Sequence, residues 1–564
     1  MPNTPEILEV NPTQLDELLR RVEEALDESD ATLIRRIFES YLYVTDLVED
    51  KKTSIRRLRE LLFGKPTEKT AAVLGRTSDQ PQMTMPPGAA AGTPLASGEP
   101  ASEPAKKTDT DTVPAPGGHG RNGADANTGG RRIAVPHPTL KPGDACPACQ
   151  EGTLYEKLAG VLVRIAGQPP LTATIYELQK LRCHLCGEIF TAEAPAEAGE
   201  GKYDATAGSM IALLKYGSGL PFNRLAGLQG HLEIPLPAST QWDVVAAVAR
   251  LLTPTFDELV RQAAQGDVLH NDDTTIKILA LMGKQGGQAA AVAAGEEGND
   301  ADERTGLFTS GVVALGEGHR VALFFSGRRH AGENLAELLK LRAAELPPPI
   351  QMCDALSRNL PRELKTIVAN CLAHARREFV DIHERFPQQC GYLLEALAVV
   401  YGNDASAKEQ QLSAEARLHF HQQHSQPVMR QLHDWLNRQL DERLAEPNSA
   451  LGGAIGYMLR HWEKLTLFLR QAGAPLDNNV CERALKKAIL HRKNALFYKT
   501  LNGARVGDLF MSLIYTCELN EVNPFDYLTR LQEHADELAA HPERWLPWNY
   551  REALATNEAP VATT

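Results

Sequence analysis

The sequence predicts a multidomain protein whose largest part is an α/β domain carrying a helical insertion. The chain has 564 residues, 43% of them apolar, and at roughly 150 residues per domain this length indicates three or four units. A stretch with few large apolar residues, 64–140, separates the N-terminal region from the rest. From residue 267 onward, short apolar runs typical of strands replace the helical spacing of the preceding segment.

The N-terminal region, 11–63, is predicted to form a coiled coil. Asn11-Pro12 is a typical helix start. A seam with alternating steps of four and three residues follows, formed by Ile37, Tyr41, Val44, Val48, Lys51, Ile55, Leu58 and Leu62. This heptad pattern favours self-association into a homodimer or higher oligomer, the alternative being an amphipathic helix packed within one chain. The segment 64–140, rich in Pro, Gly, Ala, Ser and Thr, is expected to be a flexible linker.

Residues 141–198 are predicted to form a zinc-binding ribbon. Cys146 and Cys149 form one Cys-x-x-Cys pair, and Cys183 and Cys186 form a second. Four thiolates in two short turns match the tetrahedral coordination of a structural Zn²⁺. Strands are expected between the pairs, at Gly160–Ile165 and Thr172–Leu178.

Residues 203–262 read as short helices joined by tight turns. Helices are expected at Ala205–Tyr216 and Phe222–Leu228, with a third opened by Ser239-Thr240. This order is compatible with a helix-turn-helix DNA-binding region, although three short helices occur in many folds.

The segment 263–515 is predicted to hold an α/β domain. Three strands are expected, the first over Val268–His270 and Thr274–Leu281 and the next two over Gly306–Leu315 and His319–Phe325. A helix at Ala331–Ala344 and further strands at Ile350–Cys353 and Thr366–Ala369 are expected to follow. Three antiparallel strands, a helix and further strands are the element order of a ribonuclease H-like fold. A helical insertion, about 372–470, follows, and 516–564 forms a C-terminal segment.

Three acidic residues stand where such a fold can gather a divalent-cation site. Asp272 follows the apolar start of the first strand, Asp354 follows Ile350–Cys353, and Glu482 lies in a helix opened by Asp477-Asn478-Asn479. Carboxylate oxygens suit Mg²⁺ or Mn²⁺, and an acid at the end of a buried strand needs a compensating partner. Asp273 competes with Asp272, but strand alternation places the two on opposite faces.

Several motifs resemble those of the insertion-sequence-66-type transposases. They are His270-Asn271-Asp272-Asp273-Thr274, Cys371 to Phe379, Leu476 to Arg483, His491-Arg492-Lys493-Asn494, Leu496-Phe497, and the tail with Asn523-Pro524 and Leu546-Pro547-Trp548-Asn549. The resemblance covers nearly the whole chain in the family's order. The chain departs from it in having Asp273-Thr274-Thr275 where the family usually shows Glu-Thr-Pro, and Ala355-Leu356 where it often shows Gly-Tyr.

The resemblance implies a DNA transposase with Asp272, Asp354 and Glu482 as catalytic triad and Mg²⁺ or Mn²⁺ as cofactor. Cleavage and strand transfer by two metal ions would follow. The alternatives are a ribonuclease H-like nuclease without strand transfer, and a zinc-dependent DNA-binding scaffold with a vestigial triad. Cys371 and His374 resemble a Cys-x-x-His signature of several transposase groups, for which a packing or DNA-orienting role is favoured over a metal site with Cys390 as third ligand.

Charge patterning points to double-stranded DNA as partner despite a net charge of −13. The stretch 483–505 contains basic residues and no acid, so phosphate contacts are expected from Arg483, Lys486, Lys487, Arg492 and Lys493. Net charge reports on solubility rather than on such local patches. Without a signal peptide or a long apolar run, a cytoplasmic, nucleoid-associated bacterial protein is expected. Accessory proteins of the same element are further candidate partners.

Overall fold

The computed structural model describes residues 138–144, 170–182, 189–199, 201–282, 306–316, 318–362 and 364–558, together with Thr70 and Pro147. The predicted coiled coil (11–63) and nearly all of the predicted linker (64–140) lie outside the described residues, as do Cys146, Cys149, Cys183 and Cys186. The chain divides into two compact units. One contains Tyr203–Pro221 and Trp242–Thr564, and the other contains Gln82–Lys202 and Phe222–Gln241.

In the smaller unit, a two-stranded antiparallel hairpin brackets the second cysteine pair. β1 (Lys180–Arg182) pairs with β2 (Ile189–Thr191), with Arg182 opposite Ile189. The strand predicted at Thr172–Leu178 is wrong, because residues 172–178 belong to no strand and their side chains are exposed. Ile175, for example, is 84% exposed. α6 (Phe222–His231) is the helix of this unit that matches a predicted one.

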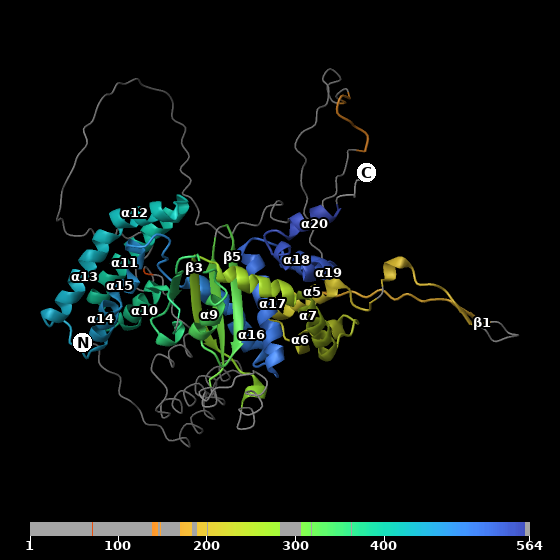
Figure 1. The fold of residues 1–564 in the computed structure, drawn as a ribbon, viewed down its shortest axis with the longest axis horizontal. Coiled ribbons are helices and arrows are strands. Elements are labelled where there is room, and N and C mark those ends of the chain that lie inside the picture. Colours follow the sequence, from red (N-terminus) through yellow and green to blue (C-terminus); the bar gives the residue numbers. More distant parts are fainter. Residues whose placement is uncertain are drawn as a thin grey trace, which may run out of the picture. The chain divides into compact units, whose positions relative to one another are not determined.

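The larger unit is built on a mixed five-stranded sheet in the order β5-β4-β3-β6-β7 (Figure 1). The strands are β3 (Val268–Thr275), β4 (Phe308–Leu315), β5 (Arg320–Gly327), β6 (Ile350–Cys353) and β7 (Ile367–Asn370). β3, β4 and β5 form an antiparallel meander, whereas β6 and β7 run parallel to β3. This mixed sheet is compatible with a ribonuclease H-like domain.

Helices cover both faces of this sheet. α9 (Ala331–Leu339) and α16 (Asn479–Ala495) each contact β3 and β4. They do so from opposite sides, because α9 hydrogen-bonds Ser310 whereas α16 packs on the neighbouring Gly311, and successive strand residues face opposite ways. α7 (Ala238–Ala264) leads into the sheet, and α5 (Ala205–Ala212), which continues as a π-helical segment over Leu213–Gly217, packs against α18 (Pro524–Glu533).

α17 (Leu501–Leu519) closes the free edge of β5 with side chains rather than with another strand. The backbone N–H groups of Arg320, Ala322, Phe324 and Ser326 donate to Asn520, Thr516, Ser512 and Asp508 respectively. Four helical residues advance about 6 Å and two strand residues about 6.7 Å. The spacing of every fourth helix residue therefore matches that of every second strand residue over four hydrogen bonds. The edge of β5 is thereby protected from pairing with another chain.

The predicted helical insertion is a layer of helices, seen beside the sheet in Figure 1, and its core is continuous with buried residues of β3, β6 and β7. It comprises α10 (Leu372–Ile382), α11 (Pro387–Glu409), α12 (Ala414–His424), α13 (Gln426–Asp441), α14 (Ala450–Arg460) and α15 (Trp462–Leu465). In α13 the helical spacing of Met429, Leu432 and Leu436 buries one face. Side-chain caps at Ser413 and Ser449 begin α12 and α14.

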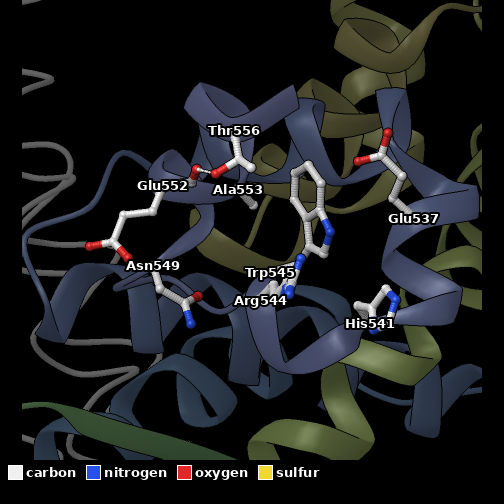
Figure 2. A pocket seen from close by; sticks show the side chains of 8 residues that line it. All are labelled: Glu537, His541, Arg544, Trp545, Asn549, Glu552, Ala553 and Thr556. Carbon is white, nitrogen blue, oxygen red and sulfur yellow. Dashed lines mark hydrogen bonds between the residues drawn. The ribbon is translucent and has the colours of Figure 1, made fainter. Parts of the chain in front are cut away.

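The C-terminal segment folds back on itself through α18, α19 (Ala535–Ala540) and α20 (Tyr550–Glu558). The hydroxyl of Tyr527 donates to the carbonyl of Trp545, and that of Tyr550 donates to Asp526. A cavity of about 330 Å³ opens among these helices around the Trp545 indole (Figure 2). None of the predicted site residues lines it. Among the described helices, none is long and apolar enough to cross a bilayer.

Candidate active site

The register of the sheet brings Asp272 and Asp354 to the same level on adjacent strands. β3 and β6 are parallel with His270 opposite Met352. Asp272, within β3, and Asp354, just after β6, each lie two residues beyond this pair, so the register places them side by side. Glu482 approaches from the first turn of α16, which packs on β3. The sheet and this helix therefore bring the three predicted acids together.

Asp272 lies at the centre of this acidic group. Its Oδ1 accepts the backbone N–H of Asp273 at 2.8 Å. Burial raises the pKa of Asp272 to about 7, and the charges of Asp354, Asp273 and Glu482 act in the same direction against the hydrogen bond, which lowers it. A carboxyl whose ionisation is opposed by burial and by neighbouring acids would be stabilised as a carboxylate by a cation bound beside it.

A buried amide network positions Asp354. Its Oδ1 accepts the backbone N–H of Leu356 at 3.1 Å and the side-chain amide of Asn359. The carbonyl of Asn359 in turn accepts from the side chains of Asn271 and Gln351. Asn359 is fully buried. The network links the loop after β6 to both neighbouring strands, and the sequence held no local signal for it.

Asn478, the residue before α16, ties the helix to β3. Its Oδ1 lies 3.0 Å from Nδ1 of His270, and its Nδ2 donates to the carbonyl of Asn271 at 3.1 Å. Burial lowers the pKa of His270 to about 4, so the ring is neutral and donates through Nδ1. The Asn478 side chain makes no capping bond to its own helix. It fixes the start of the helix four residues before Glu482.

The Cys-x-x-His motif lies beside Glu482. Ligand atoms of Cys371, His374 and Glu482 all lie within 4.8 Å of one another, and Nε2 of His374 is 3.7 Å from Oε1 of Glu482. The Cys371 sulfur accepts the backbone N–H of Asn478 at 3.2 Å, and burial raises the pKa of its thiol to about 12. Cys390, the speculative third ligand, is buried in the core of the insertion. The residue that lies beside Cys371 and His374 as a possible third ligand is thus Glu482 rather than Cys390.

Asp273 points away from this group, as strand alternation predicts. It accepts a hydrogen bond from the hydroxyl of Ser310 at 2.7 Å and lies 3.0 Å from Nδ1 of His330. Both partners lie on the α9 side of the sheet. Asp273 therefore connects β3 to β4 and to the start of α9 on that face, and Asp272 is the acid on the face of Glu482.

The five predicted phosphate-binding residues divide into two groups. Lys487 binds the carbonyl of Gly217 and the carboxylate of Glu518, and Arg492 binds Thr274 and Thr275. Both are held by internal contacts. Arg483, Lys486 and Lys493 are exposed along α16 and have no ion pair or hydrogen bond within the described part of the chain.

Comparison with known proteins shows that these residues lie in a part of the chain that matches a family model. The model of the family described as the IS66 transposase family matches residues 200–506, a range that includes all three acids. A relative from Sinorhizobium fredii (strain NBRC 101917 / NGR234), named Uncharacterized protein y4hP, is 26% identical over 432 residues, covering 74% of this chain and 75% of the relative. Uncharacterized protein y4jD from the same organism is 28% identical over 378 residues, covering 65% and 71%.

Proposed function

Because the chain belongs to the IS66 family of transposases, we propose that it cuts DNA at the ends of an insertion sequence and joins them to target DNA with divalent metal ions. Asp272, Asp354 and Glu482 would hold the ions. The observation that carries the proposal is that three carboxylates, from β3, the end of β6 and α16, converge around the half-buried Asp272.

The donor set suits Mg²⁺ or Mn²⁺. All three side chains offer hard oxygen ligands, which these ions prefer. Oε1 of Glu482 is buried and accepts no hydrogen bond in the described chain, with Nε2 of His374 3.7 Å away, and a buried acceptor without a hydrogen bond is costly unless something binds it. When bound, a pair of such ions would neutralise charge on the phosphate and on the attacking and leaving oxygens.

The reaction itself has two steps. Water attacks the phosphorus at the element's end, the P–O3′ bond breaks, and a 3′-hydroxyl is released. That hydroxyl then attacks a phosphorus in the target strand, so that a new P–O3′ bond forms as the target's own 3′-hydroxyl leaves. The protein's contribution is to hold the carboxylates and the phosphate in line, through Asn478 and Asn359 on one side and the exposed cations of α16 on the other.

Single substitutions test this function. D272N, D354N and E482Q would each be incubated with linear DNA that carries the element's ends, with Mg²⁺ or Mn²⁺. We expect strand cleavage and joining to be lost while end binding, followed by gel shift, is retained. Normal cleavage by D354N would contradict the assignment. E337Q, at an exposed acid of α9, is the neutral control.

Two further outcomes separate the alternatives. Cleavage without joining would identify a nuclease, and DNA binding without cleavage by the wild type would identify a scaffold. D273N gives a matched comparison, because Asp273 faces α9: we expect this variant to lose stability but to keep the Mn²⁺ affinity that D272N loses. Mn²⁺ binding can be measured by electron paramagnetic resonance without DNA.

A further inference from the structure

The turn that ends α16 has an unusual backbone. Leu496 has φ 68° and ψ −42°, and the N–H of Phe497 donates to the carbonyl of Ala495 at 2.8 Å. This is a γ-turn with a positive φ at its centre, a rare and strained conformation. Glycine would adopt such a φ far more readily, yet a leucine occupies the position.

The surrounding structure holds this turn firmly. The N–H of Tyr498 donates to the carbonyl of Lys277, and the carbonyl of Tyr498 accepts from Leu279. The Tyr498 ring is buried and stacks on His491, with 4.4 Å between ring centroids. A strained conformation persists only where the neighbouring structure over-determines it, and such sites cluster at functional positions.

The consequence of the turn is that two large apolar side chains face outward. Leu496 is 62% exposed and Phe497 is 42% exposed. On the exposed face of α16, Arg483, Lys486 and Lys493 lead from the neighbourhood of Glu482 towards them. The helix advances about 20 Å between Glu482 and Leu496, which corresponds to about six base pairs of duplex.

We propose that Leu496 and Phe497 form a wedge that inserts between base pairs about six positions from the cleaved phosphate. The inference rests on the proposed function and adds a DNA-distorting element to it. Apolar wedges of this kind unstack base steps and bend the duplex. The accompanying row of cations, which have no ion pair among the described residues, favours DNA over a protein partner. It complements a phosphate backbone, whereas protein interface cores are depleted of charged residues.

Fluorescence of 2-aminopurine tests the wedge directly. Full-length protein would be bound, without divalent ions, to a duplex with the element's terminal sequence in which single bases are replaced by 2-aminopurine. Its emission rises when the base is unstacked. We expect a several-fold rise confined to positions near six base pairs from the cleavage site, and no rise at any position would overturn the proposal.

Variants show whether the turn causes the rise. Leu496→Gly removes the side chain and suits the positive φ, so the protein should melt no lower than wild type and yet lose the rise. Phe497→Ser should lose it too and bind the end roughly tenfold more weakly. Leu444→Ser, at another leucine that is 59% exposed, should change neither. A rise that persists in Leu496→Gly and Phe497→Ser would refute the wedge.

Two measurements separate a DNA-binding surface from a protein interface. Lys486→Ala and Lys493→Ala should each reduce the slope of log affinity against log salt by about one, and unchanged slopes would mean that DNA does not follow α16. If Phe497→Ser alters sedimentation of the free protein but not the fluorescence, the surface is a protein interface and the proposal fails. The fluorescence assay contains no metal, so its result does not depend on cleavage. Unstacking in this assay without cleavage in the assay with Mg²⁺ or Mn²⁺ would contradict only the proposed function. Cleavage without unstacking would contradict only the wedge.

Discussion

Asn478 shows how one side chain can control the geometry of the acidic group. It is fully buried and joins the residue before α16 to the side chain of His270 and the carbonyl of Asn271. Glu482 lies four residues further along the same helix. A small shift of the helix start would therefore move this carboxylate relative to Asp272, although the Asn478 side chain hydrogen-bonds neither carboxylate.

We predict that Asn478→Ala lowers strand cleavage about a hundredfold, since a misplacement near 1 Å has effects of this size. The variant leaves the buried His270 Nδ1 and the Asn271 carbonyl without partners, so its melting temperature should also fall. End binding should not change. A fall in Mn²⁺ affinity would separate positioning from a loss of folded protein, and Asn478→Asp should be intermediate, because it can accept from His270 but cannot donate to Asn271. Full cleavage by Asn478→Ala would refute this role.

The residue scale also shows what the sequence could and could not predict. The proximity of Asp272 and Asp354 was predictable because each follows a short apolar run, and the register of parallel strands then places them together. Asn478 and Asn359 were not, because a buried amide has no local signature and its partners come from distant segments. Likewise, nothing local distinguishes Lys487 and Arg492, which bind other parts of the chain, from Lys486 and Lys493, which do not.

At the scale of elements, most of the β strands followed from their apolar patterns, and Ile350–Cys353 is confirmed at both ends. The strand expected at Thr274–Leu281 is wrong beyond Thr275, where β3 ends and a 3-10 turn at Leu279–Leu281 follows. The strand expected at Thr172–Leu178 is wrong because its side chains are exposed, so strand formation would bury no apolar surface there. The docking of α17 on β5 was likewise beyond a local pattern. Its bonds join residues such as Phe324 and Ser512, in elements separated by the whole insertion.

Asp508 makes the stability of the α17–β5 contact depend on pH. Burial raises its pKa to about 7 from an ordinary value of 3.8, although two hydrogen bonds from Ser326 oppose the shift. Between about pH 4 and 7 the folded state holds a proton that the unfolded state has lost. The stability that Asp508 contributes through this bound proton is therefore fully present below pH 4 and is lost as the pH rises through 7.

We predict that Asp508→Asn removes this dependence, because an amide can still accept from the Ser326 N–H and donate to its hydroxyl without ionising. Between pH 5 and pH 8 the wild type should lose up to about 2 kcal/mol more stability than the variant. The difference in melting temperature between the two proteins at each pH measures this. A difference that stays constant across the range would contradict the shifted pKa.

The hairpin of the smaller unit supports a prediction about zinc. β1 ends at Arg182 and β2 begins at Ile189, so Cys183 and Cys186 fall between two paired strands. We propose that they bind one structural Zn²⁺ with Cys146 and Cys149. Metal analysis of the purified protein should find about one zinc per chain, and Cys183→Ser should lower that content and the protease resistance of the region. A wild type that is folded and free of zinc would rule this site out.

At the scale of the whole molecule, transposition requires two DNA ends to be held together. The heptad seam from Ile37 to Leu62 offers a means of pairing two chains. The segment 64–140, with the composition of a flexible linker, would span on the order of 50 Å root-mean-square. Two catalytic units joined in this way could each reach a separate DNA end without touching one another beforehand.

We therefore predict that Val44→Asp combined with Val48→Asp gives monomers that bind a single end but no longer join paired ends. Charges on a heptad seam oppose association because pairing would bury them without partners. Lys51 already lies on the seam, where a lone charged residue sets register at some cost in stability, so further charges should exceed what the seam tolerates. Cleavage at one end, assayed on a single-end substrate, serves as the control for folding. Sedimentation of the full-length protein decides the question: if wild type and variant both run as monomers at micromolar concentration, the seam packs within one chain and the two ends must be brought together elsewhere.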